Sequence, residues 1–196
     1  IRWLYRKHKK ITLGYIGSIR LWYRFDQVLI YFKYLLNLYP NSILFIANKD
    51  DHKFINQLIK DHNINVKNVV IESIQHENIP DRIQEIDIGI FFIEPSFSKK
   101  ASNPTKLGEF LASGIPCITN SGIGDIDTII NENKCGVLIN DINLPIDINF
   151  VENSIKEIFL NQYQNNCRLV ASKFLSLEVA INQLDLIYKE LLQKNE

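Results

Sequence analysis

The residues best suited to chemistry lie within residues 102–116, which contain Pro104, Lys106 and Glu109. Pro104 fits the start of a helix, and the amides of a first helical turn, together with the helix dipole, form an anion site. Lys106 belongs to that turn, where a cation makes sense if an anion is bound, and Glu109 follows one turn later on the same face. A carboxylate beside a phosphate site suits the paired hydroxyls of a ribose. An ordinary exposed ion pair between Lys106 and Glu109 explains the spacing equally well.

Two glycine-containing segments have the composition of loops that bind ligands through their backbone. Gly17 and Ser18 follow the first apolar run, and glycine there lets a ligand approach the backbone closely. The spacing of Gly14 and Gly17 is not that of the dinucleotide fingerprint, so a plain turn is an equal alternative. Gly122 and Gly124 precede another helix, where a flexible turn is again the alternative. This loop and the helix start within residues 102–116 are two backbone-rich junctions at neighbouring strand ends, which favours a diphosphate.

The elements that must position these residues follow from the alternation of strand-like and helix-like periodicity along the chain. Strands are expected at residues 11–16, 43–47, 66–71, 87–93, 115–119 and 137–139. Helices are expected at residues 25–39, from 50–51 onward, at 80–86, 104–112 and 126–131, and beyond 149 with interruptions near 165–166 and 174–176. Ser102 or Asn103 is expected to cap the helix at 104–112, and Asp125 the helix at 126–131.

The strands are continuous apolar runs, as expected when helices cover both faces of a parallel sheet. We therefore predict an α/β fold, a Rossmann-like doubly wound parallel sheet of about six strands, with a C-terminal helical extension. Ligands bind such sheets outside the carboxyl ends of the strands, which is where the candidate loops fall.

Composition excludes several classes of protein. The 196 residues carry 22 basic and 22 acidic side chains, a formal net charge of zero, which does not suit a dedicated nucleic-acid binder. A hydrophobic content of 46% excludes general disorder. Three widely spaced cysteines do not suit a disulfide scaffold, and this cysteine content fits the reducing cytoplasm. The four histidines are scattered and, with the cysteines, show no spacing typical of a metal site. No apolar run reaches the roughly 18–20 residues that span a membrane.

Methionine is absent, so we expect Ile1 to lie inside a longer protein. Residues 1–10 are interpreted as a linker from a missing N-terminal domain, and residues 11–196 as one domain. The linker is basic with interleaved aromatic residues. Its alternative interpretation is a peripheral contact with a membrane surface or a partner, because basic clusters are attracted to anionic lipid.

Residues 104–116, Pro-Thr-Lys-Leu-Gly-Glu-Phe-Leu-Ala-Ser-Gly-Ile-Pro, resemble the signature helix of the family 4 glycosyltransferases of GT-B fold. Weaker similarities add residues 14–26, the strand end at 94–96, the glycine loop at 121–125 and the closing helix around 188–191. The resemblance covers the chain from about residue 11 to its end. It implies the C-terminal, donor-binding half of a two-domain enzyme whose active site lies between the domains. The N-terminal half mostly binds the acceptor and often touches membrane.

The resemblance also implies roles for individual residues. Glu109 matches the second acid of a Glu-x7-Glu motif, which binds the ribose hydroxyls. Backbone amides around Thr105 and Lys106 would meet the diphosphate, and the loop of Ser73, Ile74 and Gln75 would pack on the base. We assign catalytic roles to Lys106, Glu109 and Arg24. The predicted substrate-binding residues are Gly17, Ser18, Arg20, Ser73, Ile74, Gln75, Ser102, Pro104, Thr105, Leu107, Gly122 and Gly124.

The chain departs from the family pattern at two places. Ala101 stands where the first acid of the motif, a contact of the donor sugar, is expected, with Lys99 and Lys100 nearby. Tyr23 occupies the expected position of a lysine that touches the diphosphate. We hypothesise that Arg24 or Lys106 supplies the missing charge.

Together these inferences predict retaining, metal-independent glycosyl transfer without a cofactor. The donor would be a nucleotide-diphosphate sugar, UDP- or GDP-linked, and the acceptor a glycan or lipid-linked molecule in polysaccharide or lipopolysaccharide biosynthesis. This chain would be inactive without its N-terminal domain. Two alternatives remain open at this point: a sugar-nucleotide epimerase of GT-B fold, and a non-catalytic nucleotide-sugar-binding domain.

Overall fold

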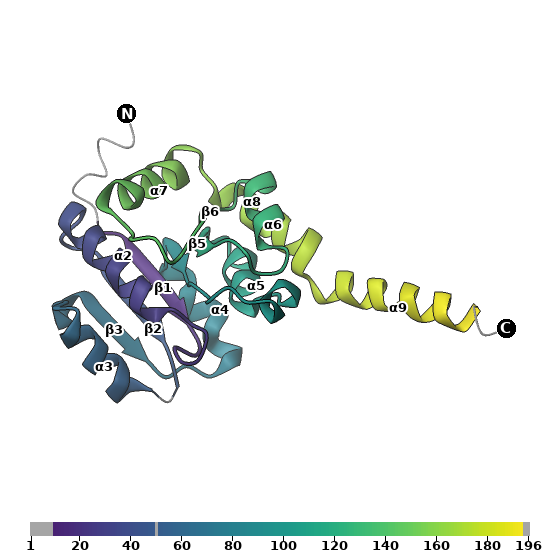
Figure 1. Cartoon of the computed structure of the whole chain (residues 1–196), viewed down its shortest axis with the longest axis horizontal. Helices are drawn as coiled ribbons and strands as arrows, with labels where there is room; N and C mark the ends of the chain where they lie inside the picture. The colour runs from purple at the N-terminus through teal and green to yellow at the C-terminus, as the bar shows by residue number, and fades with distance from the viewer. Residues whose placement is uncertain (1–9, 50, 194–196) are drawn as a thin grey trace.

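A parallel sheet forms the centre of the computed structural model, which describes residues 10–49 and 51–193 (Figure 1). Its six strands in the described residues are β1 (Thr12–Ile16), β2 (Ile43–Ala47), β3 (Val69–Glu72), β4 (Ile88–Ile90), β5 (Cys117–Asn120) and β6 (Gly136–Ile139). Their order is β3-β2-β1-β4-β5-β6, and every pair is parallel. This order is that of a doubly wound Rossmann-like sheet, so the predicted fold class is confirmed.

Helices connect the strands and cover both faces of the sheet (Figure 1). The α-helices of the described residues are α2 (Phe25–Leu38), α3 (His52–Asp61), α4 (Ile79–Arg82), α5 (Thr105–Ala112), α6 (Ile126–Asn133), α7 (Ile148–Leu160), α8 (Gln164–Val170) and α9 (Leu177–Gln193). The strand order runs outward from β1 toward β3 and from β4 toward β6, and with crossovers of the usual right hand this places α2 and α3 on one face and α5 and α6 on the other. The helix α7 then packs on α2, and α8 packs on α5 and α6.

Several strands and helices begin or end at residues other than the predicted ones. The predicted strand at 66–71 begins three residues late, because the Asn65 side chain accepts a hydrogen bond from the amide of Lys67 and starts the 3-10 turn η1 (Val66–Asn68). The ladder of β4 is shorter than predicted, since beyond it Ile93 pairs with Tyr23 in an antiparallel bridge. The first C-terminal interruption separates α7 from α8 at residues 161–163, not at 165–166.

The remaining short elements are η2 (His76–Asn78), η3 (Ile83–Glu85), η4 (Ser98–Ala101) and the π-helical turn η5 (Ala171–Leu175). After η5 the chain is extended at Ser176 and then enters α9, so the predicted interruption near 174–176 is confirmed. All residues of α9 are half-exposed or exposed, and the helix extends away from the body (Figure 1).

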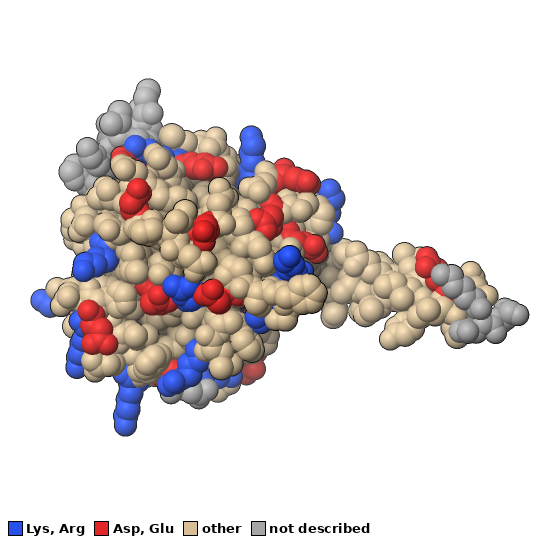
Figure 2. All heavy atoms as spheres, viewed as in Figure 1, with Lys and Arg blue, Asp and Glu red and all other residues tan. Residues whose placement is uncertain are grey.

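On the face in Figure 2, basic and acidic side chains lie interspersed over the body, as the zero formal net charge suggests. Within residues 10–49 and 51–193, no helix is both long and apolar enough to cross a bilayer. The predicted linker and its membrane contact fall almost entirely on residues 1–9, which lie outside the described residues.

The helix layer on the α2 side is tied together by a buried hydrogen bond. Tyr31 of α2 and Ser154 of α7 are both buried, and their hydroxyl oxygens lie 2.6 Å apart. Burial also raises the pKa of Tyr31 well above its usual value, so its hydroxyl stays protonated. The pair fixes the position of α7 on α2.

We expect Tyr31→Phe to lower the free energy of unfolding by about 1 kcal/mol, because a buried hydrogen bond is lost while the ring remains. Urea titration followed by circular dichroism measures the change. Tyr188→Phe, on the exposed part of α9, is the matched control and should leave stability unchanged. An equal effect of the two substitutions would contradict the structural role of the Tyr31–Ser154 pair.

Candidate functional site

The candidate site lies at the carboxyl edge of the sheet, beside the point where the strand order reverses between β1 and β4. The turn at Gly17 and Ser18 follows β1, and α5 begins next to it. The loop of Ser73 to Gln75 follows β3, two strands away. The structure thus brings together, on one edge, segments about 30 to 90 residues apart in the sequence.

Lys106 differs most from its predicted surroundings. Its side chain is buried, with 4% of the residue exposed, and Nζ donates hydrogen bonds to the carbonyl oxygens of Ile16 and Ser18. Nζ also lies 4.3 Å from the ring centroid of Tyr15 and 4.1 Å from that of Tyr23. Burial lowers the pKa of Lys106 to about 7, against the opposing effect of Glu109. The alternative of an exposed Lys106–Glu109 ion pair is therefore wrong.

Glu109 lies one turn along α5, and three-quarters of its side chain is covered. Burial raises the pKa of its carboxyl group, while nearby His76 and Lys106 act in the opposite direction. The His76 Nδ1 atom lies 3.7 Å from a Glu109 carboxylate oxygen. His76 is a surface residue, with 80% of its side chain exposed, and it directly follows the loop of residues 73–75. Its approach to Glu109 was not predicted, because spacing does not show which loops meet in space.

A cavity of about 680 Å³ opens beside Glu109, and its volume is in the range of small-molecule sites. One wall comes from η2 and α4, a second from α5 and a third from the junction of η5 and α9. Its lining includes His76, Ile79, Pro80, Thr105, Gly108, Glu109, Phe174, Ser176 and Val179. The predicted ribose-binding carboxylate therefore faces a space large enough for a ligand.

The loop after β3 is held by the loop after β2. The Ser73 hydroxyl donates to the carbonyl of Lys49 at 3.1 Å, and the Lys49 ammonium donates to Gln75 Oε1 at 3.2 Å. Ile74 is half-buried against the core. These contacts hold the loop of residues 73–75, which directly precedes His76 in the sequence.

The glycine loop after β5 supports the start of α5. A Cβ atom on Gly124 would lie 1.9 Å from the carbonyl oxygen of Ser102, and the Gly124 amide donates to the carbonyl of Lys99. The Gly122 amide donates to the Asp127 carboxylate at 2.9 Å. This loop therefore packs against the turn before α5, a contact that only a residue without a side chain allows.

The N-caps of α5 and α6 differ from the predicted ones. Pro104 is the N-cap residue of α5 instead of lying in its first turn, and no side chain caps that helix. Asp125 is the N-cap residue of α6 but makes no capping hydrogen bond. Thr105 is exposed at the start of α5, so the uncapped turn is accessible. Leu107 is fully buried in the core and its amide donates to Pro104, so its side chain packs the helix and does not face a ligand.

The predicted arginines are both paired with carboxylates. Arg20 Nε lies 2.6 Å from Asp51 Oδ1, and its guanidinium stacks on Phe54.

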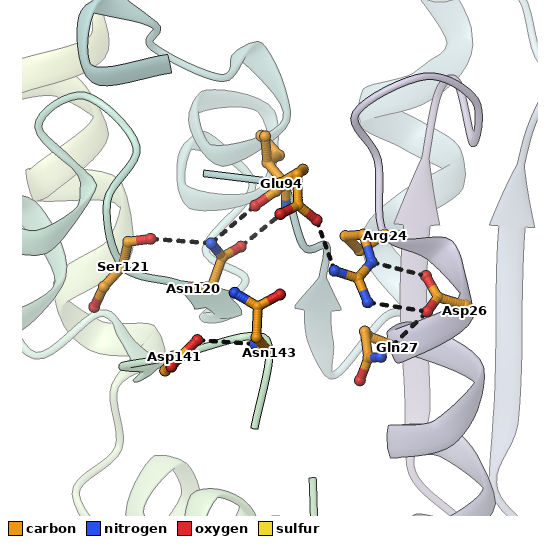
Figure 3. A network of polar contacts seen from close by, with 9 residues as sticks. Arg24, Asp26, Gln27, Glu94, Asn120, Ser121, Asp141 and Asn143 are labelled. Carbon is orange, nitrogen blue, oxygen red and sulfur yellow. Dashed lines mark hydrogen bonds and ion pairs between the residues drawn. The ribbon is translucent and has the colours of Figure 1, made fainter. Parts of the chain in front are cut away.

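Arg24 lies between Glu94 and Asp26, and its Nη1 atom is 2.6 Å from Glu94 Oε2 (Figure 3). Of the three candidate cations, Lys106 is the one without an ion pair in the described part of the chain.

The strand end beneath Glu94 is fixed by a buried amide. Asn120, at the end of β5, accepts a hydrogen bond from the amide of Ile93 at 2.8 Å and donates to its carbonyl at 2.9 Å (Figure 3). This double contact locks the continuation of β4 and so orients Glu94 and its partner Arg24. Within residues 10–49 and 51–193, no group of three or more His, Cys, Asp or Glu side chains is arranged for a metal ion.

A comparison with protein families shows to which family this chain belongs. The model of the family described as "Glycosyl transferases group 1" matches residues 2–159. The chain belongs to the group 1 glycosyltransferases. The sequence resemblance to GT-B glycosyltransferases is thereby confirmed, and a search of curated proteins gives no match.

Solved glycosyltransferases share the fold. A point mutant of TarM from S. aureus, in complex with fondaparinux, alpha-GlcNAc-glycerol and UDP, matches with TM-score 0.69 and 15% identity over 90% of this chain and 35% of that one. WaaG, a glycosyltransferase involved in lipopolysaccharide biosynthesis, matches with TM-score 0.60 and 19% identity over 87% and 46%. The C-terminal domain of LpcC, a glycosyl transferase group 1 family protein from Francisella tularensis, matches with TM-score 0.62 and 16% identity over 90% and 92%.

This chain thus spans half or less of TarM and WaaG but nearly all of the isolated LpcC domain. The GT-B assignment of the fold is confirmed by these neighbours. The division into a linker at 1–10 and a domain at 11–196 stays a prediction.

The packing of the glycine loop can be tested by one methyl group. Gly124→Ala is expected to lower the free energy of unfolding by roughly 1–3 kcal/mol, because the new Cβ collides with the Ser102 backbone. Gly108→Ala in α5 is the control. Its Cβ meets Leu175 at an ordinary 3.8 Å, and helix propensity predicts a gain of about 0.5–1 kcal/mol. Thermal unfolding measures both changes in stability, and changes of opposite sign would support the packing of Gly124 on the Ser102 backbone. An unchanged stability of Gly124→Ala would contradict it.

Proposed function

We propose that this glycosyltransferase chain binds a nucleotide-diphosphate sugar, UDP- or GDP-linked, for retaining transfer to a glycan or lipid-linked acceptor. One observation carries the proposal: a buried lysine without an ion pair in the described residues lies between a glycine turn and the uncapped start of a helix. A carboxylate one helical turn further on faces a cavity. Anions bind at such helix starts, and the carboxylate suits ribose hydroxyls.

In this proposal each part of the donor meets one part of the site. The diphosphate lies at the turn of Gly17 and Ser18 and the first turn of α5, above the charge of Lys106. Glu109 accepts hydrogen bonds from the ribose, and the base packs toward the loop of residues 73–75. The UDP named for the TarM complex agrees with a diphosphate ligand in a protein of the same fold.

The chemistry proposed is electrostatic. The acceptor oxygen forms a bond to the anomeric carbon on the face that the leaving group vacates, the bond from that carbon to the diphosphate oxygen breaks, and the electron pair stays with the diphosphate. The acceptor hydroxyl proton passes to the departing diphosphate. Fixed amides, the helix dipole and Lys106 stabilise the developing negative charge, and no metal ion or cofactor is required in this proposal.

Partners and location follow from the same proposal. An N-terminal domain of the same protein would supply the acceptor site, and this chain alone would bind donor but transfer little sugar. WaaG, named for lipopolysaccharide biosynthesis, has the same fold, and we propose a related bacterial surface polysaccharide or lipopolysaccharide as the product. The enzyme would work in the cytoplasm, peripheral to the inner face of the plasma membrane.

Calorimetric titration with UDP, GDP and their sugar conjugates tests the donor site. We expect saturable binding of one nucleotide series, weakened about ten- to a hundredfold by Glu109→Gln, because a hydrogen bond to a charged group is worth roughly 1.5–3 kcal/mol. Glu132→Gln, on the exposed surface of α6, is the control. Absence of binding in the wild type, or binding insensitive to Glu109→Gln, would refute this assignment. Appearance of epimerised donor without acceptor would favour the epimerase alternative.

The pH dependence of nucleotide affinity gives a second test. The pKa of Lys106 is about 7 in the free chain, with Tyr15, Tyr23 and Glu109 as the titratable groups that face it. A bound diphosphate favours the charged ammonium and raises this pKa, so binding takes up protons. Affinity should therefore fall as pH rises from 7 to 9, by up to about tenfold per pH unit. Calorimetry in two buffers of different ionisation heat measures the uptake; pH-independent affinity would contradict the proposed role of Lys106.

A further inference from the structure

We propose that Lys106 is a positioning residue: its buried ammonium holds the carbonyl groups of the turn at residues 16–18 inward, so that the backbone of this turn, and not Lys106 itself, contacts the diphosphate. This inference rests on the proposed function, and it assigns the phosphate contact to a different group of atoms.

Three successive carbonyl oxygens of the turn are held by side chains. Lys106 Nζ donates to Ile16 and, at 3.1 Å, to Ser18. The Asn48 amide donates to Gly17 at 3.1 Å, and the Tyr15 hydroxyl donates to Ser18 at 2.5 Å. The turn is thus shaped from below by three different elements: β1, the loop after β2 and α5.

The ammonium is enclosed on its remaining sides. The rings of Tyr15 and Tyr23 lie 4.3 and 4.1 Å from Nζ, and a Cβ atom on Gly17 would lie 3.2 Å from it. Gly17 and Ser18 are themselves exposed. A ligand that approaches from solvent therefore meets the turn first, and contact with Nζ would require the turn to move.

The side chains beneath the turn occupy its carbonyl groups, so some of its amide groups stay available to a ligand. The Gly17 amide donates to Ala47, and the Arg20 amide faces Ser18 Oγ at 3.3 Å. The amides of Ser18 and Ile19 have no acceptor in the described part of the chain. Gly17 has φ +86°, a left-handed conformation that glycine adopts without strain, and it reverses the chain at this point. Successive amides in such a turn form a concave anion site, and a cation beneath it adds to the attraction.

Lys106→Met removes the two hydrogen bonds and the charge while keeping an unbranched apolar side chain. We expect faster hydrogen exchange at the Gly17 amide and displaced amide resonances of Ser18 and Ile19 in the ligand-free chain. We also expect at least tenfold weaker binding of whichever of UDP or GDP binds the wild type, with unchanged affinity for the corresponding nucleoside. Lys33→Met, an exposed lysine of α2, controls for the loss of one positive charge.

The outcomes separate this inference from the proposed function. Weaker diphosphate binding with an unaltered ligand-free turn would mean that Lys106 contacts the phosphate directly, and would overturn the inference. Equal losses for nucleoside and nucleotide would show a general structural role and overturn it as well. If the wild type binds neither UDP nor GDP, the proposed function fails, while the exchange measurement still decides whether Lys106 shapes the turn.

Tyr15→Phe is the second variant, in case Lys106→Met does not fold. It removes the hydroxyl that donates to Ser18 but keeps the ring beneath the ammonium. A smaller change in the same amide signals and a smaller loss of diphosphate affinity are expected. Unchanged signals and affinity in Tyr15→Phe would contradict a turn shaped through its carbonyl groups.

Discussion

The burial of one ammonium group, that of Lys106, ties the start of α5 to the end of β1. An unpaired charge in a protein interior is strongly unfavourable unless polar partners replace water. Two carbonyl oxygens and two aromatic faces provide this replacement. The space around the ammonium is limited: a Cβ atom on Gly17 would lie 3.2 Å from Nζ, and the rings of Tyr15 and Tyr23 lie 4.3 and 4.1 Å from it.

The sheet topology gives this contact its importance. The strand order reverses between β1 and β4, so the loops after these strands diverge and leave a crevice at the carboxyl edge. The helix α5, which follows β4, starts at this crevice and is supported from the other side by the close approach of Gly124 to Ser102. Lys106 on one side and Gly124 on the other therefore fix the first turn of α5 relative to the sheet.

The sequence was sufficient for the fold because its strands are apolar throughout and its helices are periodic, so element order determines the sheet. It was less informative about details that depend on the partner of a side chain. Spacing predicts that Lys106 and Glu109 share a face, but only packing shows that the lysine turns under β1. Asn65 starts a 3-10 turn through a local hydrogen bond that periodicity does not register. His76 lies close to Glu109 only because the loop after β3 and the helix α5, which follows β4, meet in space.

The departure at Tyr23 has a structural counterpart. The family resemblance places a lysine at this position after the first strand, whereas here the Tyr23 ring lies 4.1 Å from an ammonium that arrives from α5. A positive charge beside the turn is thus present, but it comes from a different element and from beneath the backbone. Arg24, the neighbouring candidate, is neutralised by Glu94 and Asp26. On the proposed function, the charge that the resemblance expects at residue 23 would come from Lys106, which donates hydrogen bonds to the turn.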